Sequence, residues 1–554
     1  MEKLDIKISE IGNFSVDKGI KIEDFIKSSK DLENSKYLCA RINNEIIHLD
    51  YTIEKSGSIE LLDITDEDGS RVYIRTLTFI LLKALNELFP KASVSIEHSL
   101  SEGLYIEIHK ERPLQCTEIN TIREKMQDII NKKLPINRIL MSTNEADNIF
   151  RKQRMKDKLR LSKYRLKEYV HVYELDGFYD KFYGYLATST EYIDKFDLKY
   201  YHPGIILQYP RKESNYKVPK FQKQNKLAQI FKEAEDWGKI LDVEDVGSLN
   251  DKIAEGSIEE IVRINEALHE KKIAYIADRI SNDNNTKIIL IAGPSSSGKT
   301  TFAQRLYTQL RVNGKRPISL SLDDYFVNRE DTPLDEMGNY DFESIDAIDI
   351  KKFNEDLTIL LNGGQIDVPK FNFLTGKREI KIMGFSITDD QPIIIEGIHG
   401  LNEKLTNKIS HKYKFKIYVS ALTQLNIDKH NRIPTTDNRL IRRIVRDSKY
   451  RGRSAEGTLE LWSSVRRGEE RSIFPFQESA DVMFNSELVY ELAILRKYAE
   501  PLLKEVKRTS IHYAEAKRLS KFLKYFNFIR NDDIIPSTSI LKEFIGGSCY
   551  REEE

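Results

Sequence analysis

The sequence predicts an α+β N-terminal half followed by an α/β domain with a doubly wound parallel sheet. Three observations support this prediction. Strand-like and helix-like segments alternate from about residue 287 onward, which is typical of a parallel sheet covered by helices. The runs at 288–292 and 393–395 are continuously apolar, as expected for strands that are buried on both faces. Short strand-like runs with a few helices fill the first part of the chain and indicate smaller mixed modules.

The composition excludes several classes of protein. The length of 554 residues suggests about two to four domains, and 40% hydrophobic residues are enough to build their cores. Lys+Arg and Asp+Glu each number 87, so neither a globally basic nor a globally acidic chain is indicated. Three scattered cysteines, the lack of an apolar run of membrane-spanning length and the lack of a secretory leader predict a soluble cytoplasmic protein.

Individual elements follow from local patterns. Apolar residues at helical spacing predict a helix over 75–88, and Asn43-Asn44-Glu45 between two strand-like runs predicts a hairpin turn. In the α/β domain, a helix follows residue 300 and ends near Gly314. The expected strands of that domain are 287–292, 317–322, 392–395, 415–419 and 481–484.

Residues 151–168 form a basic segment with nine Lys or Arg against two acids. One interpretation is a site for tRNA or another anionic partner. The alternative is a solvated charged helix, which the interleaved apolar residues favour.

The strongest motif is Gly293-Pro294-Ser295-Ser296-Ser297-Gly298-Lys299-Thr300, which matches the phosphate-binding pattern G-x-x-x-x-G-K-[ST] between a buried strand and a helix. Backbone N–H groups of such a loop, through Thr301, can surround phosphate oxygens at a helix N-terminus. Lys299 can reach the β- and γ-phosphates, and the Thr300 hydroxyl can bind Mg²⁺. The motif predicts a site for ATP and Mg²⁺.

Carboxylates follow two of the predicted strands. Asp323 and Asp324 end the second strand, and Glu396 ends the third. Sites in doubly wound sheets form at the carboxyl ends of strands, so these side chains are expected to face the phosphates. One of the aspartates could accept a proton from an attacking hydroxyl, and Glu396 could hold Mg²⁺ directly or through water.

A basic run follows between Arg439 and Arg453, with seven Lys or Arg and one acid, Asp447. The pattern of its first part predicts an amphipathic helix, and Arg451-Gly452-Arg453 predicts a hinge. Because the run follows a phosphate-binding loop and two strand-end carboxylates, we interpret it as a lid whose arginines face phosphates.

Residues 287 to about 490 resemble the uridine/cytidine kinase and phosphoribulokinase family of P-loop kinases. The resemblance rests on GPSSSGKTT, SLSLDDYF, YDFESIDAID, VPKFNFLTGKR, IIIEGIHGLN, RLIRRIVRDSKYRGRS and ADVMFNSE, which occur in that family's order. It implies that Asp323 is the general base for a nucleoside 5′-hydroxyl and that Glu343 binds the ribose. It also implies substrate contacts by Tyr325, Phe371 and Arg378, and phosphate contacts by the lid residues Arg446, Arg451 and Arg453, with Lys299 and Arg446 acting in catalysis.

Two departures from the family pattern affect the acceptor. Uridine kinases carry a histidine in the substrate hairpin that reads the pyrimidine edge, and Gly376 stands in its place. Asn372 replaces an aspartate. Because a lost hydrogen-bond partner can change discrimination greatly, phosphoryl transfer is better supported than uridine as its acceptor.

Residues 1 to about 250 resemble the N-terminal part of threonyl-tRNA synthetase, a TGS β-grasp module followed by an editing-type domain. The matching pieces are CARINNEIIHLDYTIE, SIELLDITDEDGSRVY and HSLSEGLYIEI. Arg75 and Phe79 stand at the two histidines of the synthetase's editing helix, and Phe182 and Leu186 at its later cysteine and histidine. The resemblance therefore implies a retained fold without deacylation.

These observations predict five units: a TGS-like module at 1–60, an editing-like domain at 61–225, a helical linker at 226–284, a P-loop kinase domain at 285–490 and a helical extension at 491–554. The predicted function is an ATP- and Mg²⁺-dependent nucleoside kinase. The alternatives are a kinase of another small hydroxyl acceptor, such as a sugar phosphate, and a nucleotide-dependent RNA-binding or regulatory protein. The expected partners are a nucleoside substrate, RNA bound through the N-terminal half, and further copies of the chain. No contact with a membrane is expected.

Overall fold

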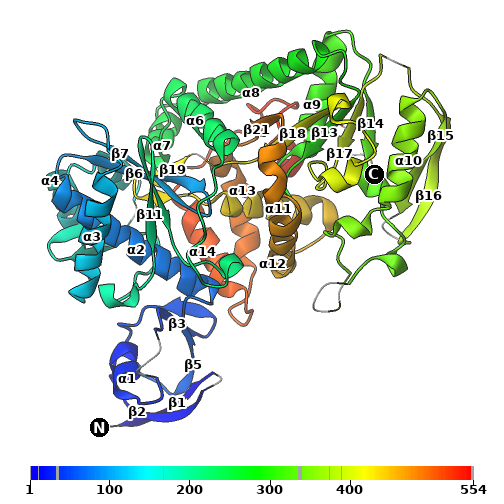
Figure 1. Cartoon of the computed structure of the whole chain (residues 1–554). Coiled ribbons are helices and arrows are strands. Elements are labelled where there is room, and N and C mark those ends of the chain that lie inside the picture. Colours follow the sequence, from blue (N-terminus) through cyan, green and yellow to red (C-terminus); the bar gives the residue numbers. More distant parts are fainter. Residues whose placement is uncertain are drawn as a thin grey trace.

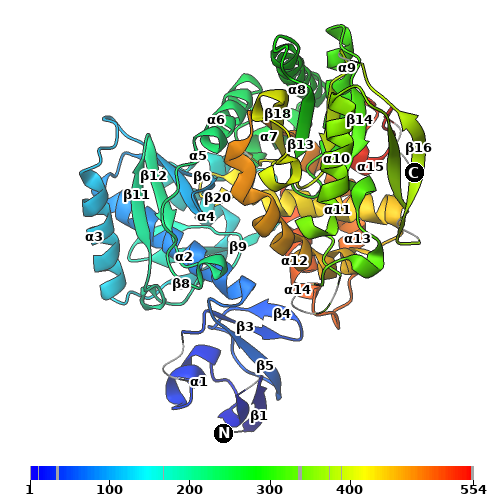
Figure 2. The ribbon, with the colours of Figure 1, turned by 45° about the vertical axis from the view of Figure 1, so that its right-hand side comes forward.

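Three bodies follow one another along the chain, and a small N-terminal module lies below the other two in both views (Figures 1 and 2). The structure is a computed structural model that describes residues 2–9, 11–32, 36–165, 167–334, 338, 340–372, 375–388, 390–423 and 425–550. Within these ranges, no helix is long and apolar enough to cross a membrane.

The N-terminal module is a mixed five-stranded sheet in the order β2-β1-β5-β3-β4 with helix α1 packed on it. Asn43 and Asn44 both have left-handed backbone conformations, with φ of 51° and 58°, and join β3 to β4. Two such residues suit a tight hairpin turn, and the predicted hairpin is confirmed. The elements are β1 (Lys3–Ile8), β2 (Gly12–Asp17), α1 (Ile22–Ser28), β3 (Cys39–Ile42), β4 (Glu45–Ile47) and β5 (Gly57–Leu62).

The second body surrounds helix α2 (Glu67–Leu88), whose middle is buried on nearly every side. Two antiparallel sheets, β10-β9-β8 and β11-β12-β7-β6, supply the rest of its core. The helix predicted at 75–88 is thus confirmed and begins earlier, because the Asp66 side chain caps it by accepting the Asp68 N–H. The other elements are β6 (Ser93–Leu100), β7 (Gly103–His109), α3 (Glu118–Asn131), β8 (Asn137–Ser142), α4 (Thr143–Lys152), α5 (Lys156–Ser162), β9 (Tyr169–Leu175), β10 (Phe178–Asp180), β11 (Asp197–Tyr201) and β12 (Gly204–Gln208).

The third body contains the predicted parallel sheet, in the order β14-β17-β13-β18-β21 with every pair parallel. Alternate residues of β13 face opposite layers: Ile289 packs with α9, whereas Ile288 packs with α10. Helices on both faces make the sheet doubly wound, as the apolar runs predicted. Its strands are β13 (Ile288–Ala292), β14 (Ile318–Ser321), β17 (Ile393–Glu396), β18 (Lys414–Ser420) and β21 (Val482–Asn485), with a hairpin of β15 (Ile366–Asn372) and β16 (Lys377–Phe385) beside them.

Helices before and after this sheet close it. Helix α8 packs on α9, and α13 packs on both α11 and α14. A short C-terminal helix, α15, contacts α11 as well. Their bounds are α6 (Asn225–Ile240), α7 (Val246–Ala254), α8 (Ile258–Ser281), α9 (Lys299–Val312), α10 (Ile350–Leu361), α11 (Thr435–Arg451), α12 (Ala455–Ser472), α13 (Glu491–Lys504), α14 (Tyr513–Leu523) and α15 (Lys542–Ile545).

A hairpin of the third body, β19 (Asn426–Asp428) and β20 (Asn431–Arg432), joins the two larger bodies. The Ile96 N–H of β6 donates to the Lys429 carbonyl at 2.7 Å, and the Asn426 side chain donates to the Ile96 carbonyl at 2.9 Å. These hydrogen bonds fix the second body against the third by backbone pairing rather than by side-chain contact alone.

Lys158 of the basic segment is the buried centre of this junction. Its Nζ lies 2.9 Å from Asp180 Oδ1 and 2.9 Å from Asp428 Oδ1, and the three side chains are at most 1% exposed. Burial alone would raise the pKa of Asp180, but Lys158 and His430 lower it to about 2. The interpretation of a wholly solvated helix is therefore wrong at Lys158, whose anionic partners lie within the chain.

Lys158→Met should destabilise the protein strongly, because it leaves two buried carboxylates without their cation. Loss of one partner of a buried ion pair costs about 3–5 kcal/mol. Lys156→Met on the exposed side of α5 is the matched control and should change the free energy of unfolding by less than about 0.5 kcal/mol. Thermal and denaturant unfolding of both variants measure the difference, and equal stabilities would contradict the structural role of Lys158.

Candidate active site

The phosphate-binding loop joins β13 to α9 as predicted. Gly298 caps α9 in a left-handed conformation, with φ of 80°, and Ser296 has φ of 59°. A Cβ on Gly293 would lie 1.9 Å from the Val419 carbonyl of β18, so only glycine fits beside the neighbouring strand. The loop therefore turns tightly and leaves the first N–H groups of α9 facing outward from the helix end.

Two arginines of α11 donate hydrogen bonds to backbone carbonyls of the loop. Arg439 Nη1 donates to the Ser295 carbonyl at 3.2 Å, and Arg442 Nη1 donates to the Ser296 carbonyl at 3.3 Å. Both are at most 1% exposed and are paired with the equally buried Glu469 and Glu491. The first part of the basic run is thus a buried support rather than a lid, which corrects our interpretation of these two residues.

The charge of Lys299 acts on three carboxylates: Asp323 just after β14, Glu396 at the end of β17, and Glu343 in the segment between β14 and α10. Burial, followed by Asp324, raises the pKa of Asp323, which Lys299 and Arg451 oppose. Burial raises the pKa of Glu343 to about 7 and that of Glu396 to about 7, and Lys299 partly offsets both shifts. Asp323 also raises the pKa of both Glu343 and Glu396, so the site concentrates negative charge around one ammonium group.

Thr300 and Glu396 are placed to bind a divalent cation together. Thr300 Oγ1 lies 2.8 Å from Glu396 Oε1. Both are hard oxygen donors of the kind that Mg²⁺ prefers. No cluster of three or more His, Cys, Asp or Glu with metal-site geometry occurs in the described part of the chain. The residues therefore fit a Mg²⁺ ion that takes its remaining ligands from water and from phosphate oxygens.

Glu343 is positioned by helix α12. The Glu343 carbonyl accepts a hydrogen bond from Ser472 Oγ at 3.2 Å. A Cβ on Gly468 would lie 2.5 Å from Glu343 Cβ, so the helix approaches this loop only because residue 468 lacks a side chain. Neither Gly468 nor Ser472 was found from the sequence, because nothing in a single sequence links them to a residue more than a hundred positions away.

The lid arginines meet at one carboxylate. Asp447 is fully buried and binds Arg446 at 3.1 Å, Arg451 at 3.3 Å and Arg443 at 3.2 Å. Arg443 also donates to Ser295 Oγ at 2.8 Å, which ties the same carboxylate to the phosphate-binding loop. Arg453 is partly exposed beyond the end of α11. The predicted lid is therefore a helix end anchored to Asp447, with Arg451 close enough to Asp323 to influence its pKa.

The predicted acceptor residues lie around the β15–β16 hairpin. Phe371 is 2% exposed, and its N–H donates to Asp324 Oδ1 at 3.4 Å. Arg378 pairs with Asp349 at 3.0 Å. Tyr325 is 1% exposed, and its hydroxyl donates to Asp356 Oδ2 at 3.1 Å. The structure thus places Tyr325 in the core beneath the site rather than among the converging carboxylates.

Gly376 turns the hairpin in a left-handed conformation with φ of 70°. Arg329 covers it: the Arg329 N–H donates to the Gly376 carbonyl at 2.8 Å, and a Cβ on Gly376 would lie 2.9 Å from Arg329 Nε. A guanidinium group therefore lies beside the turn, at the position where the resemblance described above led us to expect a histidine. Sequence analysis missed Arg329, because its contact with residue 376 depends on the fold of the hairpin.

In the second body, the four editing positions do not form a catalytic group. Phe79, Phe182 and Leu186 are at most 7% exposed in one core, and the rings of Phe79 and Phe182 lie 5.3 Å apart. Arg75 donates to the Tyr185 carbonyl at 3.2 Å. Hydrophobic packing thus replaces the polar side chains that an editing reaction needs.

Glu343→Gln should make the stability of the protein less dependent on pH. The pKa of Glu343 is raised to about 7, so the folded state keeps this proton better than the unfolded chain, in which the pKa is about 4.3. The resulting stability is complete below about pH 4 and is lost as the pH rises through about 7. The Gln variant should therefore melt above the wild type at pH 8, whereas the exposed Glu355→Gln should not. Parallel melting curves of wild type and Glu343→Gln from pH 5 to 8 would contradict the assignment.

Comparison with known proteins separates the two halves. The model of the phosphoribulokinase/uridine kinase family matches residues 288–492. A uridine kinase of Staphylococcus haemolyticus is 30% identical over 200 residues, which cover 36% of this chain and 87% of that protein. One of Halobacterium salinarum is 28% identical over 195 residues, covering 35% and 77%. A solved structure titled as a possible uridine kinase from Bacillus stearothermophilus is 21% identical, covers 36% of this chain and 88% of its own, and has a TM-score of 0.24.

The N-terminal region matches a different enzyme. A threonine–tRNA ligase of Desulforamulus reducens is 29% identical over 153 residues, which cover 28% of this chain and 24% of that ligase. The chain thus spans about a quarter of the length of the ligases that it matches. A region related to threonyl-tRNA synthetase is therefore fused to a P-loop kinase domain. Through that domain, the chain belongs to the phosphoribulokinase/uridine kinase family.

Proposed function

We propose that this chain transfers the γ-phosphate of ATP to the 5′-hydroxyl of a nucleoside. The observation that carries the proposal is that Lys299 of the phosphate-binding loop acts electrostatically on Asp323, Glu343 and Glu396, while Glu396 lies 2.8 Å from the Thr300 hydroxyl of the same loop. A loop alone would support nucleotide binding. A base, an acceptor-binding carboxylate and a metal-binding carboxylate around the lysine support phosphoryl transfer to a hydroxyl.

On the donor side, the N–H groups from Gly298 to Thr301 at the start of α9 bind the phosphates, and Lys299 neutralises the β- and γ-phosphate charge. Mg²⁺, held through Thr300 and Glu396, would supply further neutralisation of that charge. Arg446, Arg451 and Arg453 approach the γ-phosphate from the end of α11. A closed lid also excludes water, which protects ATP from hydrolysis.

On the acceptor side, Asp323 accepts the proton of the 5′-hydroxyl as its oxygen bonds to the γ-phosphorus. The bond from that phosphorus to its bridging oxygen breaks, and ADP leaves. Glu343 holds the ribose hydroxyls, while Phe371 and Arg378 line the acceptor side of the hairpin and Tyr325 supports it from the core. Lys299 and Arg451 oppose the rise in the pKa of Asp323 that desolvation causes, and they thus favour the ionised form that its role as a base requires.

A sugar phosphate is the second candidate acceptor, and Arg329 favours it. The guanidinium beside Gly376 is suited to a phosphate or carboxylate rather than to the edge of a pyrimidine. Nucleosides and sugar phosphates therefore belong in the same assay.

We also propose a cytoplasmic location and contact with RNA through the synthetase-like region. The three cysteines are all unpaired thiols, which fits a reducing compartment. The likeness of the N-terminal region to threonine–tRNA ligases supports RNA as a partner.

Asp323→Asn should lower the rate of phosphoryl transfer by about 10²- to 10⁴-fold, because the amide cannot accept the hydroxyl proton. ATP binding should change little, since Asp323 acts on the acceptor. Coupled ADP release measures the first quantity and titration calorimetry the second. Asp346→Asn, exposed on the same body, is the matched control and should retain activity. Normal turnover by Asp323→Asn would remove Asp323 from the proposed role.

A further inference from the structure

A large cleft lies between the synthetase-like body, α11, α12 and the C-terminal helices. Its volume is about 2470 Å³. Part of its wall is formed by Arg165 and Lys181 of the second body, together with Tyr183 and with Tyr525, which follows α14. These four residues come from two bodies, so anything bound among them would contact both.

Arg165 and Lys181 are two basic side chains that form no ion pair with a carboxylate among the described residues. All three guanidinium nitrogens of Arg165 are buried and lack a hydrogen-bond partner among the residues that the structure describes. Lys181 is 8% exposed, and its Nζ faces the Tyr183 ring at 5.3 Å and the Tyr525 ring at 6.0 Å. Burial, and then the neighbouring Arg165, lower the pKa of Lys181 to about 6.

The nearest carboxylate does not neutralise this pair. Asp428 is already bound by Lys158 at 2.9 Å and by the Tyr183 hydroxyl at 3.1 Å. Buried charges are ordinarily paired, so a buried guanidinium beside a buried amine favours an anion that would pair with the first and let the second keep its proton.

We propose that Arg165 and Lys181 bind the phosphate group of a small ligand, at a site separate from the phosphate-binding loop. A guanidinium fork and an ammonium group together match several oxygens of one phosphate. The rings of Tyr183 and Tyr525, whose centres are 4.3 Å apart, form an aromatic wall beside it. The enclosed position of the guanidinium favours a small ligand over a polymer. A bound phosphate would link the synthetase-like body to the C-terminal helices.

The test uses the full chain carrying Lys299→Ala, which weakens phosphate binding at the loop. Calorimetric titration with inorganic phosphate, pyrophosphate and AMP should show one remaining site for at least one probe. Added Lys181→Met or Arg165→Met should weaken that binding roughly tenfold or more. Added Lys156→Met, an exposed cation on α5, should not. Binding by phosphate or pyrophosphate alone indicates a phosphate site, whereas a preference for AMP adds the base to the recognised ligand. Absence of binding by every probe, or unchanged binding in both Met variants, would overturn the proposal.

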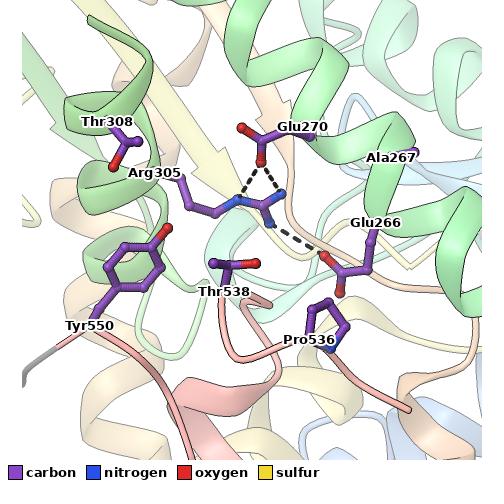
Figure 3. A pocket seen from close by; sticks show the side chains of 8 residues that line it. All are labelled: Glu266, Ala267, Glu270, Arg305, Thr308, Pro536, Thr538 and Tyr550. Carbon is purple, nitrogen blue, oxygen red and sulfur yellow. Dashed lines mark hydrogen bonds and ion pairs between the residues drawn. The ribbon is translucent and has the colours of Figure 1, made fainter. Parts of the chain in front are cut away.

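A second inference concerns residues 536–550, which lie beyond the segment that matches the kinase family. They pack against α8 and α9, and Figure 3 shows Pro536, Thr538 and Tyr550 facing Arg305 of α9 and Glu266 of α8. The residues from Ser539 to Leu541 are fully buried, as is Phe544. This C-terminal segment is therefore a fixed part of the third body.

The C-terminal segment also touches the phosphate-binding loop. Glu543 Oε2 accepts hydrogen bonds from Thr301 Oγ1 at 2.7 Å and from the Thr301 N–H at 3.3 Å. A Cβ on Gly298 would lie 2.4 Å from Ile540 Cγ2. On the lid side, Lys449 Nζ donates to the Ile545 carbonyl at 2.7 Å. The segment thus lies against both the loop and the lid helix.

The geometry points to an autoinhibitory contact in which Glu543 competes with the phosphates of the nucleotide. Thr301 is the third residue of α9, and its N–H is one of the helix-end donors that bind anions. The Glu543 carboxylate now fills that place as an internal anion. A nucleotide must displace it or tolerate its charge, and either requirement weakens binding. This inference rests on nucleotide binding by the loop, which is part of the proposed function.

Titration of the full chain with ADP–Mg²⁺ tests the contact without requiring phosphoryl transfer. Glu543→Gln and Glu543→Ala should both bind ADP about five- to tenfold more tightly than the wild type. Glu505→Gln removes an exposed charge at the end of α13 and should bind like the wild type. Unchanged or weaker binding by both Glu543 variants would overturn the autoinhibitory contact. Failure of the proposed function is distinguishable, because the wild type and Lys299→Ala would then bind ADP equally.

Discussion

The buried ion pairs of α11 are the constraint on which the site depends. Arg439 with Glu469, and Arg442 with Glu491, are almost completely removed from solvent. Such pairs are costly to desolvate and are stable only when their remaining hydrogen-bonding groups are satisfied. Here Arg439 donates one such hydrogen bond to the Ser295 carbonyl, and Arg442 donates one to the Ser296 carbonyl. The same contacts that make the ion pairs tolerable therefore fix the backbone of the phosphate-binding loop.

The function proposed for the carboxylate cluster depends on this fixed loop. Three acids with raised pKa values around one lysine are costly to ionise, first because the surrounding protein desolvates them and then because like charges lie nearby. Binding of ATP–Mg²⁺ and of a hydroxyl acceptor would relieve this repulsion, because the metal neutralises charge and the acceptor gives a proton to Asp323. The charge arrangement is reversed on the lid, where one buried carboxylate, that of Asp447, pairs with three arginines near the loop.

Much of the fold could be predicted from the sequence, because local patterns determine it. Continuous apolar runs located β13 and β17, the glycine-rich motif located the loop, and Asn43-Asn44 located a hairpin. Asp323 and Glu396 were predictable as well, because strand ends of a parallel sheet meet at one edge, whereas Glu343 came only from the resemblance to the kinase family. The resemblance to two families supplied the division between the halves.

What the sequence did not reveal depends on contacts between distant residues. Arg439 and Arg442 resemble lid arginines until their partners, 30 and 49 residues away, are seen to bury them. Lys158 resembles any lysine on a charged helix, yet it binds a carboxylate 270 residues away. Arg329 beside Gly376 and Glu543 on Thr301 have no local signature either. Each of these is a polar contact between two residues. Such a contact leaves far less of a periodic pattern in the sequence than the packing of an apolar helix or strand face does.

Transfer of label from γ-labelled ATP–Mg²⁺ to a panel of ribonucleosides and sugar phosphates tests the central claim most directly. One acceptor class should become phosphorylated, with one ADP formed for each labelled product and little free phosphate released. A nucleoside 5′-monophosphate would identify the first acceptor class, and a doubly phosphorylated sugar would identify the second. Label that appears only as inorganic phosphate, or ATP that is not consumed with any acceptor, would contradict the claim that this site is a phosphotransferase.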